Sequence, residues 1–310
     1  MTDYAIEEIL ASLSQKKIKY AYYGDRSIRV SGFSPIVDYQ RGTLTWIKSK
    51  EKYVSLESRV VWNEIDLAVM DSDTKQKTDG IRNAIVCENP KNVFYTILEN
   101  FFTQEEKRDC IGKYSVVESG AKIEVNVYIG SNCYIGNKVR ICEGTRIGNN
   151  VVIEGNVYIG RNCRIKSGAV IGGDGYGYRK EKEAYYHTHH FGGVRIGDNV
   201  DIGSNTCIDK GSMSDTVIGC GSKIDNLCHI AHNVRIGNGV MVVAGAVIAG
   251  SAEIGDNAYI APGAIVRNQI SVGQGSLIGM GGVLTEDAGE NYVYMGVPAK
   301  SIREVKNENL

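Results

Sequence analysis

Proline is scarce in this sequence, with 4 residues among 310, whereas glycine is abundant, with 37. The chain has no apolar run that approaches the roughly 18 to 20 residues needed to cross a bilayer. Its first residues, MTDYAIEEILASLSQKK, lack the basic segment and the apolar stretch of a signal peptide. We therefore expect a cytoplasmic protein with no membrane span.

Neither sign of charge is in excess, since 35 Lys and Arg stand against 36 Asp and Glu. Nucleic acid is not an expected partner, because general binding to it needs a broad positive field. The 8 cysteines include no CxxC pair. A chain of this length needs no disulfide staples, so we expect reduced thiols that pack in the interior. A strand–GxGxxG–helix pattern is also missing, which argues against a dinucleotide-binding fold.

A six-residue repeat dominates what the sequence does contain. An aliphatic residue occupies every sixth position over 111–171, 196–208 and 218–284, which gives 26 repeat units, or hexads. This period fits neither an α-helix, with about 3.6 residues per turn, nor an amphipathic strand, with a period of about 2. We predict a three-sided parallel solenoid of eight to nine coils in which each hexad is a short strand plus a turn. Gly, Asn and Asp in the turns tolerate positive φ.

The repeat is broken twice. The step from Ile171 to Ile196 is 25 residues, so part of 172–195 must leave the solenoid as a loop. The step from Ile208 to Ile218 is 10 residues, so four extra residues bulge out near 211–215. Because loops on a rigid scaffold commonly carry binding groups, we expect the functional site near these breaks.

The segments outside the repeat are expected to form two smaller parts. Residues 1–103 have helical periodicity over 3–15 and again after Asn89-Pro90, with strand-like runs between, which predicts a small α/β domain. The solenoid is expected over 104–285 with its loop insertion near 172–195, and 286–310 as a short C-terminal cap.

Several stretches resemble the UDP-3-O-acylglucosamine N-acyltransferase family of lipid A synthesis. The most specific are SGAVIGGDGYGY (167–178), VRIGDNVDIGSNTCIDKGSMSDTVIG (194–219) and IDNLCHIAHNVRIG (224–237), and GTLTWIKSKEKY (42–53) is similar more loosely. The resemblance implies a mainly β fold, a left-handed parallel β-helix behind a small nucleotide-binding domain. It also implies that Trp46 and Tyr53 sandwich the uracil ring and that His232 is the general base.

The end of the chain departs from that family. The resembled enzymes carry a C-terminal helical extension associated with docking of acyl carrier protein, whereas GVPAKSIRE is typical of sugar acetyltransferases that use coenzyme A. We therefore favour an N-acyltransferase that acts on a dTDP- or UDP-linked amino sugar with acyl-CoA, and expect no tightly bound cofactor. A lipid A enzyme that uses an acyl carrier protein is the alternative. A sugar O-acetyltransferase and a non-catalytic scaffold also stay open.

Amide formation from a thioester requires a group that takes a proton from the attacking amine. A neutral imidazole with a pKa near about 6.5 suits this task. We expect His232 in this role, oriented by Asp225, although His232 as a turn residue bonded to the next coil is the simpler reading. The substrate is expected to contact, besides Trp46 and Tyr53, a group of aromatic, imidazole and amide side chains: Tyr176, Tyr178, His189, His190, Asn226 and His229. We expect the acyl donor to bind at Gly250, Arg267 and Asn268.

Two further expectations concern metal ions and assembly. His187, His189 and His190 are close in sequence, and His229 and His232 have HxxH spacing, but no Cys or Glu completes a tetrahedral set, so we expect no metal. The run GVMVVAGAVIAGSA (239–252) is small or apolar at nearly every position. Such a face would be buried against a neighbour, which favours a homotrimer of prisms.

Overall fold

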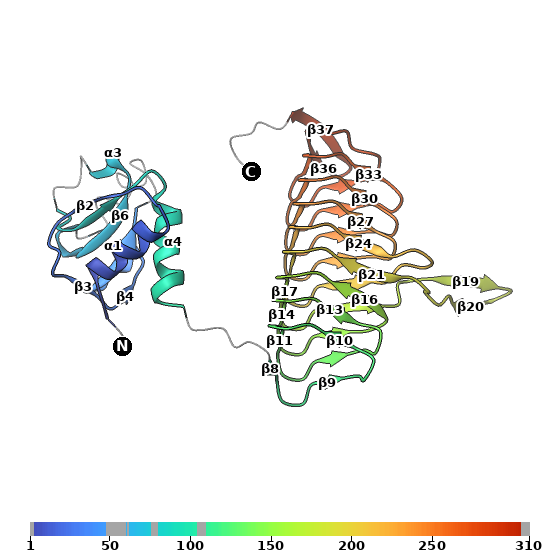
Figure 1. Ribbon diagram of the computed structural model, residues 1–310. Coiled ribbons are helices and arrows are strands. Elements are labelled where there is room, and N and C mark those ends of the chain that lie inside the picture. The colour runs from blue at the N-terminus through green and yellow to red at the C-terminus, as the bar shows by residue number, and fades with distance from the viewer. Residues whose placement is uncertain (1–2, 48–59, 61, 76–79, 104–109, 305–310) are drawn as a thin grey trace. The chain divides into compact units, whose positions relative to one another are not determined.

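The computed structural model describes residues 3–47, 60, 62–75, 80–103 and 110–304. The chain divides into two compact units, Met1–Glu106 and Lys107–Leu310, both drawn in Figure 1. Among the described residues, no helix has both the length and the apolar character that a membrane span requires.

The N-terminal unit is a five-stranded sheet with helices packed on it (Figure 1). The strand order is β2 (Ala21–Tyr23), β7 (Ala84–Val86), β6 (Leu67–Met70), β5 (Thr43–Trp46), β4 (Gly32–Phe33). β4 to β7 are parallel to one another and β2 is antiparallel. Shorter elements complete the unit: β1 (Tyr4–Ala5), β3 (Arg29–Val30), η1 (Ile36–Asp38), η2 (Trp62–Glu64) and α3 (Ser72–Lys75).

Two amphipathic helices, α1 (Ile6–Gln15) and α4 (Pro90–Phe101), supply one core of this unit. Helix α1 buries the four residues that its helical spacing predicts, Ile6, Ile9, Leu10 and Leu13. Helix α4 begins as its sequence predicts, because the Asn89 side chain accepts a hydrogen bond from the Asn92 N–H at 3.1 Å and Pro90 follows the cap. Both helices pack with Leu44, Leu67 and Ile85 of the sheet.

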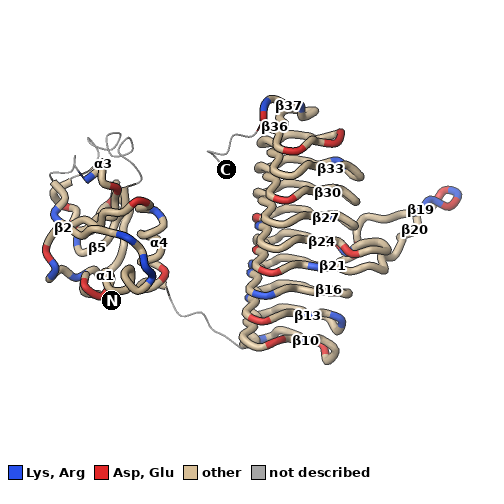
Figure 2. Tube along the Cα trace, turned by 45° about the horizontal axis from the view of Figure 1, so that its top comes forward, with Lys and Arg blue, Asp and Glu red and all other residues tan. Residues whose placement is uncertain are grey.

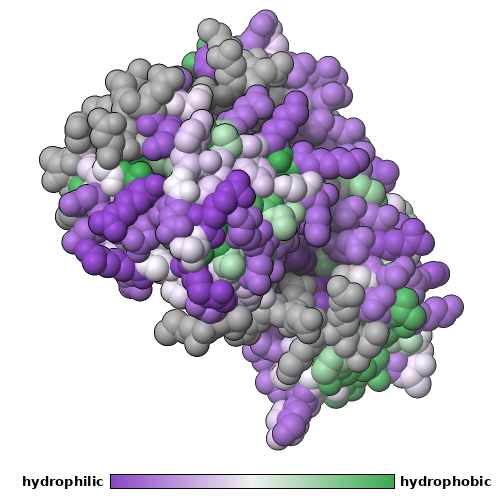
Figure 3. Space-filling view, turned by 60° about the vertical axis from the view of Figure 1, so that its left-hand side comes forward, coloured by the Kyte–Doolittle hydropathy of each residue, from purple (hydrophilic) through white to green (hydrophobic). Residues whose placement is uncertain are grey.

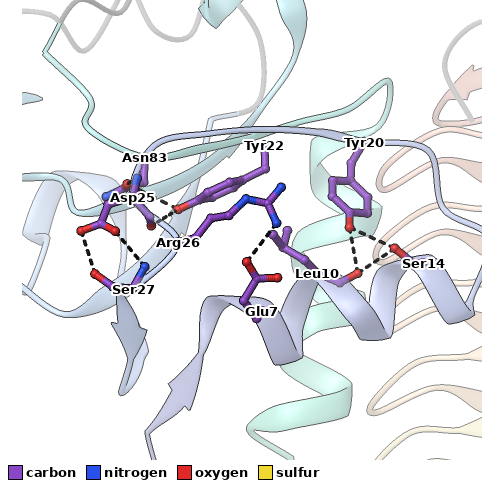
Figure 4. A network of polar contacts seen from close by, with 9 residues as sticks. All are labelled: Glu7, Leu10, Ser14, Tyr20, Tyr22, Asp25, Arg26, Ser27 and Asn83. Carbon is purple, nitrogen blue, oxygen red and sulfur yellow. Dashed lines mark hydrogen bonds and ion pairs between the residues drawn. The ribbon is translucent and has the colours of Figure 1, made fainter.

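A polar network ties α1 to the following loop (Figure 4). The Tyr22 hydroxyl donates to the Asp25 carbonyl at 2.6 Å, and the Tyr20 hydroxyl donates to the Leu10 carbonyl at 2.9 Å. The Arg26 guanidinium pairs with Glu7 at 2.9 Å. Burial, with the Asp25 charge adding to it, raises the pKa of Tyr22 to about 12. This tyrosine therefore remains a hydrogen-bond donor over the whole neutral range.

The second unit is a three-sided prism (Figure 1). The first sheet contains β8 (Cys110–Ile111), β11 (Tyr128–Ile129), β14 (Arg146–Ile147), β17 (Arg164–Ile165), β22 (Asp201–Ile202), β25 (Lys223–Ile224), β28 (Met241–Val242), β31 (Tyr259–Ile260) and β34 (Leu277–Ile278). The second contains β9 (Val116–Val117), β12 (Tyr134–Ile135), β15 (Val152–Ile153), β18 (Val170–Gly173), β23 (Cys207–Asp209), β26 (His229–Ile230), β29 (Val247–Ile248), β32 (Ile265–Val266) and β35 (Val283–Leu284). The third contains β10 (Lys122–Ile123), β13 (Arg140–Ile141), β16 (Asn156–Ile159), β21 (Gly193–Ile196), β24 (Thr216–Ile218), β27 (Arg235–Ile236), β30 (Glu253–Ile254) and β33 (Ser271–Val272).

Each of the predicted inward positions lies in one of these strands and pairs with its equivalent in the next coil, as Ile129 does with Ile147. From Ile129 onward these side chains are almost fully buried and form one continuous core. The first coil is less buried, because none of the described residues forms a coil below it: Ile111 is 54% exposed, and Val117 and Ile123 are partly buried. The solenoid prediction is therefore confirmed, since a stacked aliphatic ladder is what burial of each strand's inward face requires.

The two breaks in the period form excursions from the same corner. After β18 the chain leaves the prism as a hairpin of β19 (Tyr178–Glu181) and β20 (Ala184–His187), which projects sideways in Figure 1. The tip of this hairpin carries charges of both signs (Figure 2). The bulge near 211–215 follows β23. At the C-terminal end of the prism, β36 (Tyr292–Gly296) adds to the first sheet and pairs with β37 (Ala299–Glu304).

The outer faces of the sheets differ in chemistry. The outward residues of the second sheet are mostly apolar: Val116, Tyr134, Val152, Val170, Cys207, His229, Val247, Ile265 and Val283. Those of the third sheet are mostly charged or polar: Lys122, Arg140, Tyr158, Arg195, Val217, Arg235, Glu253 and Ser271. We call the outward residues of the second sheet the apolar face. On the side drawn in Figure 3 most of the surface is hydrophilic and hydrophobic residues gather in small areas.

Candidate active site

The corner between the second and third sheets collects both excursions and His232. The hairpin leaves after β18, the bulge leaves after β23, and His232 lies in the turn after β26. These strands are neighbours, since β18 pairs with β23 and β23 with β26. The coils are bonded at this corner as well, because Lys210 N–H donates to the Gly173 carbonyl and Ser251 N–H to the His232 carbonyl. We call this the site corner.

Asn233 fixes the tautomer of His232. Its amide orientation is determined by its own contacts, because Nδ2 donates to the Ser214 carbonyl at 3.3 Å and Oδ1 accepts from the Ser212 N–H at 3.0 Å. His232 Nδ1 lies 3.0 Å from that Oδ1. An amide oxygen only accepts, so Nδ1 carries the proton and Nε2 of the neutral ring carries the lone pair.

Gly250, one coil above, lies against the basic edge of the ring. A Cβ placed on Gly250 would be 2.8 Å from both Nε2 and Cε1 of His232. Any side chain here would displace the imidazole, so the close approach requires glycine. The Nε2 edge of the His232 ring therefore lies against the backbone of Gly250.

His190 returns from the hairpin to meet His232. Their ring centroids are 5.2 Å apart in an edge-to-face arrangement, and the His190 side chain is only 2% exposed. Its Nδ1 donates to the Thr188 carbonyl at 3.1 Å, which leaves Nε2 as an acceptor. Burial, together with the neighbouring His232, lowers the pKa of His190, so this ring is neutral at pH 7.

Two carboxylates, those of Asp174 and Asp209, are acidic groups at the site corner. Asp174 Oδ1 accepts from Lys210 Nζ at 2.8 Å and from the His190 N–H at 3.3 Å. Burial opposes the charge of Asp174, but the Lys210 ammonium holds the pKa of this carboxyl below its ordinary value. Asp209 lies 3.6 Å from His229 Nε2. Burial raises the pKa of Asp209, and the surrounding imidazoles offset this only partly.

Not all of the predicted site residues lie at this corner. Asp225 and Asn226 follow β25 of the first sheet and so occupy a different corner. Asn226 Oδ1 accepts from the Ser204 N–H at 2.7 Å, which is a turn contact. The expectation that Asp225 orients His232 is therefore wrong: the partner of Nδ1 is Asn233, because the seven residues from Asp225 to His232 carry the chain round to the next corner.

The remaining predicted residues of the prism lie near the site corner or on the loop that leaves the prism after β18. Tyr176 and Tyr178 are exposed on the loop, with ring centroids 5.0 Å apart. His189 Nδ1 is 3.9 Å from Asp174 Oδ2. Arg267 and Asn268 follow β32 two coils above His232, where Arg267 donates to the Thr285 carbonyl at 3.1 Å.

Sequence reasoning gave no site role to Asn233, which it interpreted as a structural turn residue, and missed Asp174, Asp209 and Lys210. A signal for the last two was available in the repeat. The four-residue bulge lengthens the coil below His232 from 18 to 22 residues, and counting back 22 from His232 leads to Lys210, beside Asp209. A constant coil length of 18 residues would lead instead to Ser214, within the bulge itself.

The predicted nucleobase residue Trp46 lies in the N-terminal unit beside a cavity of about 500 Å³. The lining is largely aromatic and aliphatic, and includes Phe33, Phe94, Tyr95 and Leu98. Trp46 and Phe94 have ring centroids 6.2 Å apart. Tyr53, predicted to face Trp46, lies outside the described residues.

Comparisons with known proteins agree with this architecture. Residues 138–173 and 215–250 match the family model described as bacterial transferase hexapeptide (six repeats). A solved UDP-N-acetylglucosamine acyltransferase is similar with a TM-score of 0.58 and 26% identity, over 62% of this chain and 73% of its own. The enzyme of that name from Francisella novicida gives 0.57 and 31%, over 62% and 68%. The left-handed parallel β-helix implied by the family resemblance is confirmed.

Curated relatives extend the similarity beyond the prism. The UDP-3-O-acylglucosamine N-acyltransferase of Neisseria meningitidis is 34% identical over 265 residues, 80% of this chain and 73% of that protein. The one from Saccharophagus degradans is 33% identical over 73% of this chain and 68% of its own length. The one from Pseudomonas syringae is 44% identical over 141 residues, but the chain spans only 40% of its length.

Proposed function

Because the chain belongs to the UDP-3-O-acylglucosamine N-acyltransferase family, we propose that it transfers an acyl group from a thioester to the amino group of a UDP-linked glucosamine. One observation of the site carries this proposal. Asn233 leaves the lone pair of His232 on Nε2, next to Gly250 and at the corner where both excursions leave the prism. Family membership leaves a sugar O-acetyltransferase and a non-catalytic scaffold without support.

The proposed reaction needs one base and one oxyanion donor. The amine nitrogen attacks the thioester carbonyl carbon, a C–N bond forms, and His232 Nε2 takes the proton that the nitrogen sheds. The tetrahedral intermediate then expels the thiolate, and the imidazolium returns that proton to the sulfur. The backbone N–H of Gly250 has no hydrogen-bond partner among the described residues. We assign to it the role of donating a hydrogen bond to the oxyanion of the tetrahedral intermediate.

The loop residues are assigned to the sugar nucleotide. His190 presents a buried, neutral Nε2 beside His232, an acceptor suited to a sugar hydroxyl or to the second amine hydrogen. Tyr176, Tyr178 and His189 are exposed above the same corner. In the N-terminal unit the apolar cavity beside Trp46 suits a flat nucleobase, with Trp46 stacking on the ring.

The relatives change the choice of nucleotide and donor. Their names specify a UDP-linked acylglucosamine, which favours the lipid A alternative over the dTDP and acyl-CoA reading of the sequence. Acyl-CoA finds no support among them. We therefore propose an acyl carrier protein as the donor and a lipid A precursor as the product, with the acyl chain passing Gly250, Arg267 and Asn268 above His232.

We also propose a homotrimer. The outward residues of the second sheet form an apolar face along the prism, and contiguous apolar surface of this kind marks protein interfaces. The run 239–252 contributes less than expected, because only Met241 and Val247 of its strand residues point outward and they belong to different sheets. Three prisms related by a closed rotation would bury the apolar face.

Substitution of His232 tests the proposed function. His232→Ala and His232→Asn should lower kcat by at least about 100-fold, since general base catalysis contributes about 10² to 10⁴. Initial rates of amide formation provide the measurement, with UDP binding by calorimetry as the control for an intact fold. Near-normal turnover in both variants would remove His232 as the base.

A further inference from the structure

The loop that leaves the prism after β18 brings two more histidines beside Asp174. His187 ends β20 and His189 follows two residues later, so both rings lie on the same side of an extended segment. Asp174 belongs to the first turn of the loop, and the return strand places it next to these rings. One ligand atom each from Asp174, His187 and His189 lies within 4.8 Å of the other two.

The distances suit a small cation after modest side-chain rotation. His189 Nδ1 is 3.9 Å from Asp174 Oδ2, and the His187 and His189 rings are perpendicular with centroids 5.3 Å apart. Tetrahedral zinc with bonds of about 2.0 to 2.1 Å places its ligand atoms about 3.3 Å apart. All three side chains are exposed, so a closure of up to about 1.5 Å needs no repacking of a core.

The carboxylate is already oriented as a metal ligand would be. Its Oδ1 is held by Lys210 Nζ at 2.8 Å and by the His190 N–H, while Oδ2 is the oxygen that faces the histidines. Carboxylates that bind metals are usually held in this way by hydrogen bonds to the other oxygen. The backbone around the histidines is held too, because Thr188 N–H donates to the Gly177 carbonyl at 2.8 Å.

We propose that Asp174, His187 and His189 bind one divalent transition-metal ion of the zinc class. Two imidazoles and a carboxylate match the ligand preference of Zn²⁺ over Mg²⁺ or Ca²⁺, which prefer oxygen. Three protein ligands leave a fourth position open to water or to an oxygen of a bound ligand. The ion ties the first turn of the loop to its return strand and so fixes the loop above the site corner.

This inference reverses the expectation of no metal site. That expectation relied on a missing Cys or Glu near the histidines, and the ligand that completes the set is an Asp that the fold brings from 13 residues upstream. No step of the proposed acyl transfer uses the ion, but the inference shares His189 with the proposed function, which assigns this residue to the sugar nucleotide.

Zinc binding by the full chain tests the proposal. The purified protein is stripped with a chelator, titrated with Zn²⁺ by calorimetry, and titrated in parallel with Co²⁺ to record the visible bands of a tetrahedral site. We expect one equivalent per chain. Affinity should fall by at least about 100-fold in Asp174→Asn and in the double variant His187→Ala/His189→Ala, because even residues behind the ligands change affinity by about 10- to 100-fold.

His229→Gln is the matched control, because His229 faces Asp209 and not this cluster. It should retain the full equivalent of zinc. Equal zinc affinity in the wild type and the double variant would overturn the proposal, as would a wild type that binds no equivalent. Neither result would bear on the His232 test.

Discussion

The proton of the His232 ring lies on Nδ1, since the Asn233 oxygen beside it has no hydrogen to give. The orientation of that amide is itself held by Ser212 and Ser214, both in the bulge that breaks the repeat. An irregularity in one coil thus determines which nitrogen is basic in the next coil. The bulge therefore has a role in the site, because its serines orient the amide that places the proton on Nδ1 of His232.

Substitution of Gly250 tests the close approach at the ring. Gly250→Ala places a Cβ 2.8 Å from His232 Nε2, so the exposed end of the ring must move. Misplacement by about 1 Å can cost about 100-fold in rate, and we expect a loss of that order in kcat with little change in thermal stability. Steady-state kinetics and a melting curve on the same preparation provide the measurement.

Gly136→Ala is the matched control for Gly250→Ala. Gly136 lies at the same corner in a lower coil, and a Cβ there would meet the Ile153 carbonyl oxygen only at 3.4 Å. We expect this variant to retain activity. An active Gly250→Ala enzyme would mean that the ring has more room than the structure shows.

Prediction at the residue scale depended on coil length. His232 could be proposed because the stretch that contains it, 224–237, resembles the family and because a neutral imidazole suits a general base. Its partner could not, since a carboxylate was expected to orient the ring, whereas the group that lies beside Nδ1 is the amide of the adjacent Asn233. Asp174 and His190 meet only because the excursion between β18 and β21, residues 174–192, returns to its own corner, and no period describes that path.

The turns of the prism depend on residues that accept a left-handed backbone. Asn150 has φ of 56°, and its side chain is exposed at the end of a turn. The same conformation recurs at Asn132, Asn162, Asn199, Asn205 and Asn257. Since this region costs most L-residues about 1 to 2 kcal/mol, Asn and Gly are selected at these positions.

Paired substitutions at Asn150 test this account of the turns. Asn150→Ala should destabilise the prism by about 1 kcal/mol, because alanine lacks the local hydrogen bonds that make this conformation tolerable for Asn. For a unit of this size that corresponds to about 2 to 4 °C in Tm. Asn150→Gly should melt above Asn150→Ala, and the reverse order in calorimetry would contradict the turn argument.

At the scale of the element, the strands were the most predictable part. A side chain such as Ile153 stacks on identical neighbours above and below, so its position follows from the period alone. The hairpin of β19 and β20 was expected only as a loop, because its pairing of Tyr178 with His187 is antiparallel and its residues are exposed. An exposed two-stranded ribbon leaves little hydrophobic pattern in the sequence.

The whole molecule presents an apolar face that one copy alone would leave in water. Ile265 is 40% exposed on that face, in line with Val247 below it and Val283 above it. Ile265→Glu should therefore weaken the proposed trimer by placing a charge in its interface. Sedimentation or light scattering should give three times the 33.8 kDa chain mass for the wild type and a lower mass for the variant.

Ser271→Glu provides the comparison, since Ser271 is exposed on the charged third sheet. It should retain the mass of the wild type. A wild type that sediments at the mass of one chain would contradict the trimer, and an unchanged Ile265→Glu variant would exclude the apolar face as its interface.

Direct detection of the acylated product is the measurement that tests the central claim. The protein is incubated with a UDP-linked 3-O-acylglucosamine and an acyl thioester, on acyl carrier protein in one arm and on coenzyme A in the other, and the sugar nucleotide is analysed by tandem mass spectrometry. We predict the added mass of one acyl group on the sugar nitrogen, dependent on His232 and faster with the carrier protein. Acylation of a hydroxyl, or no product with either donor, would contradict the account.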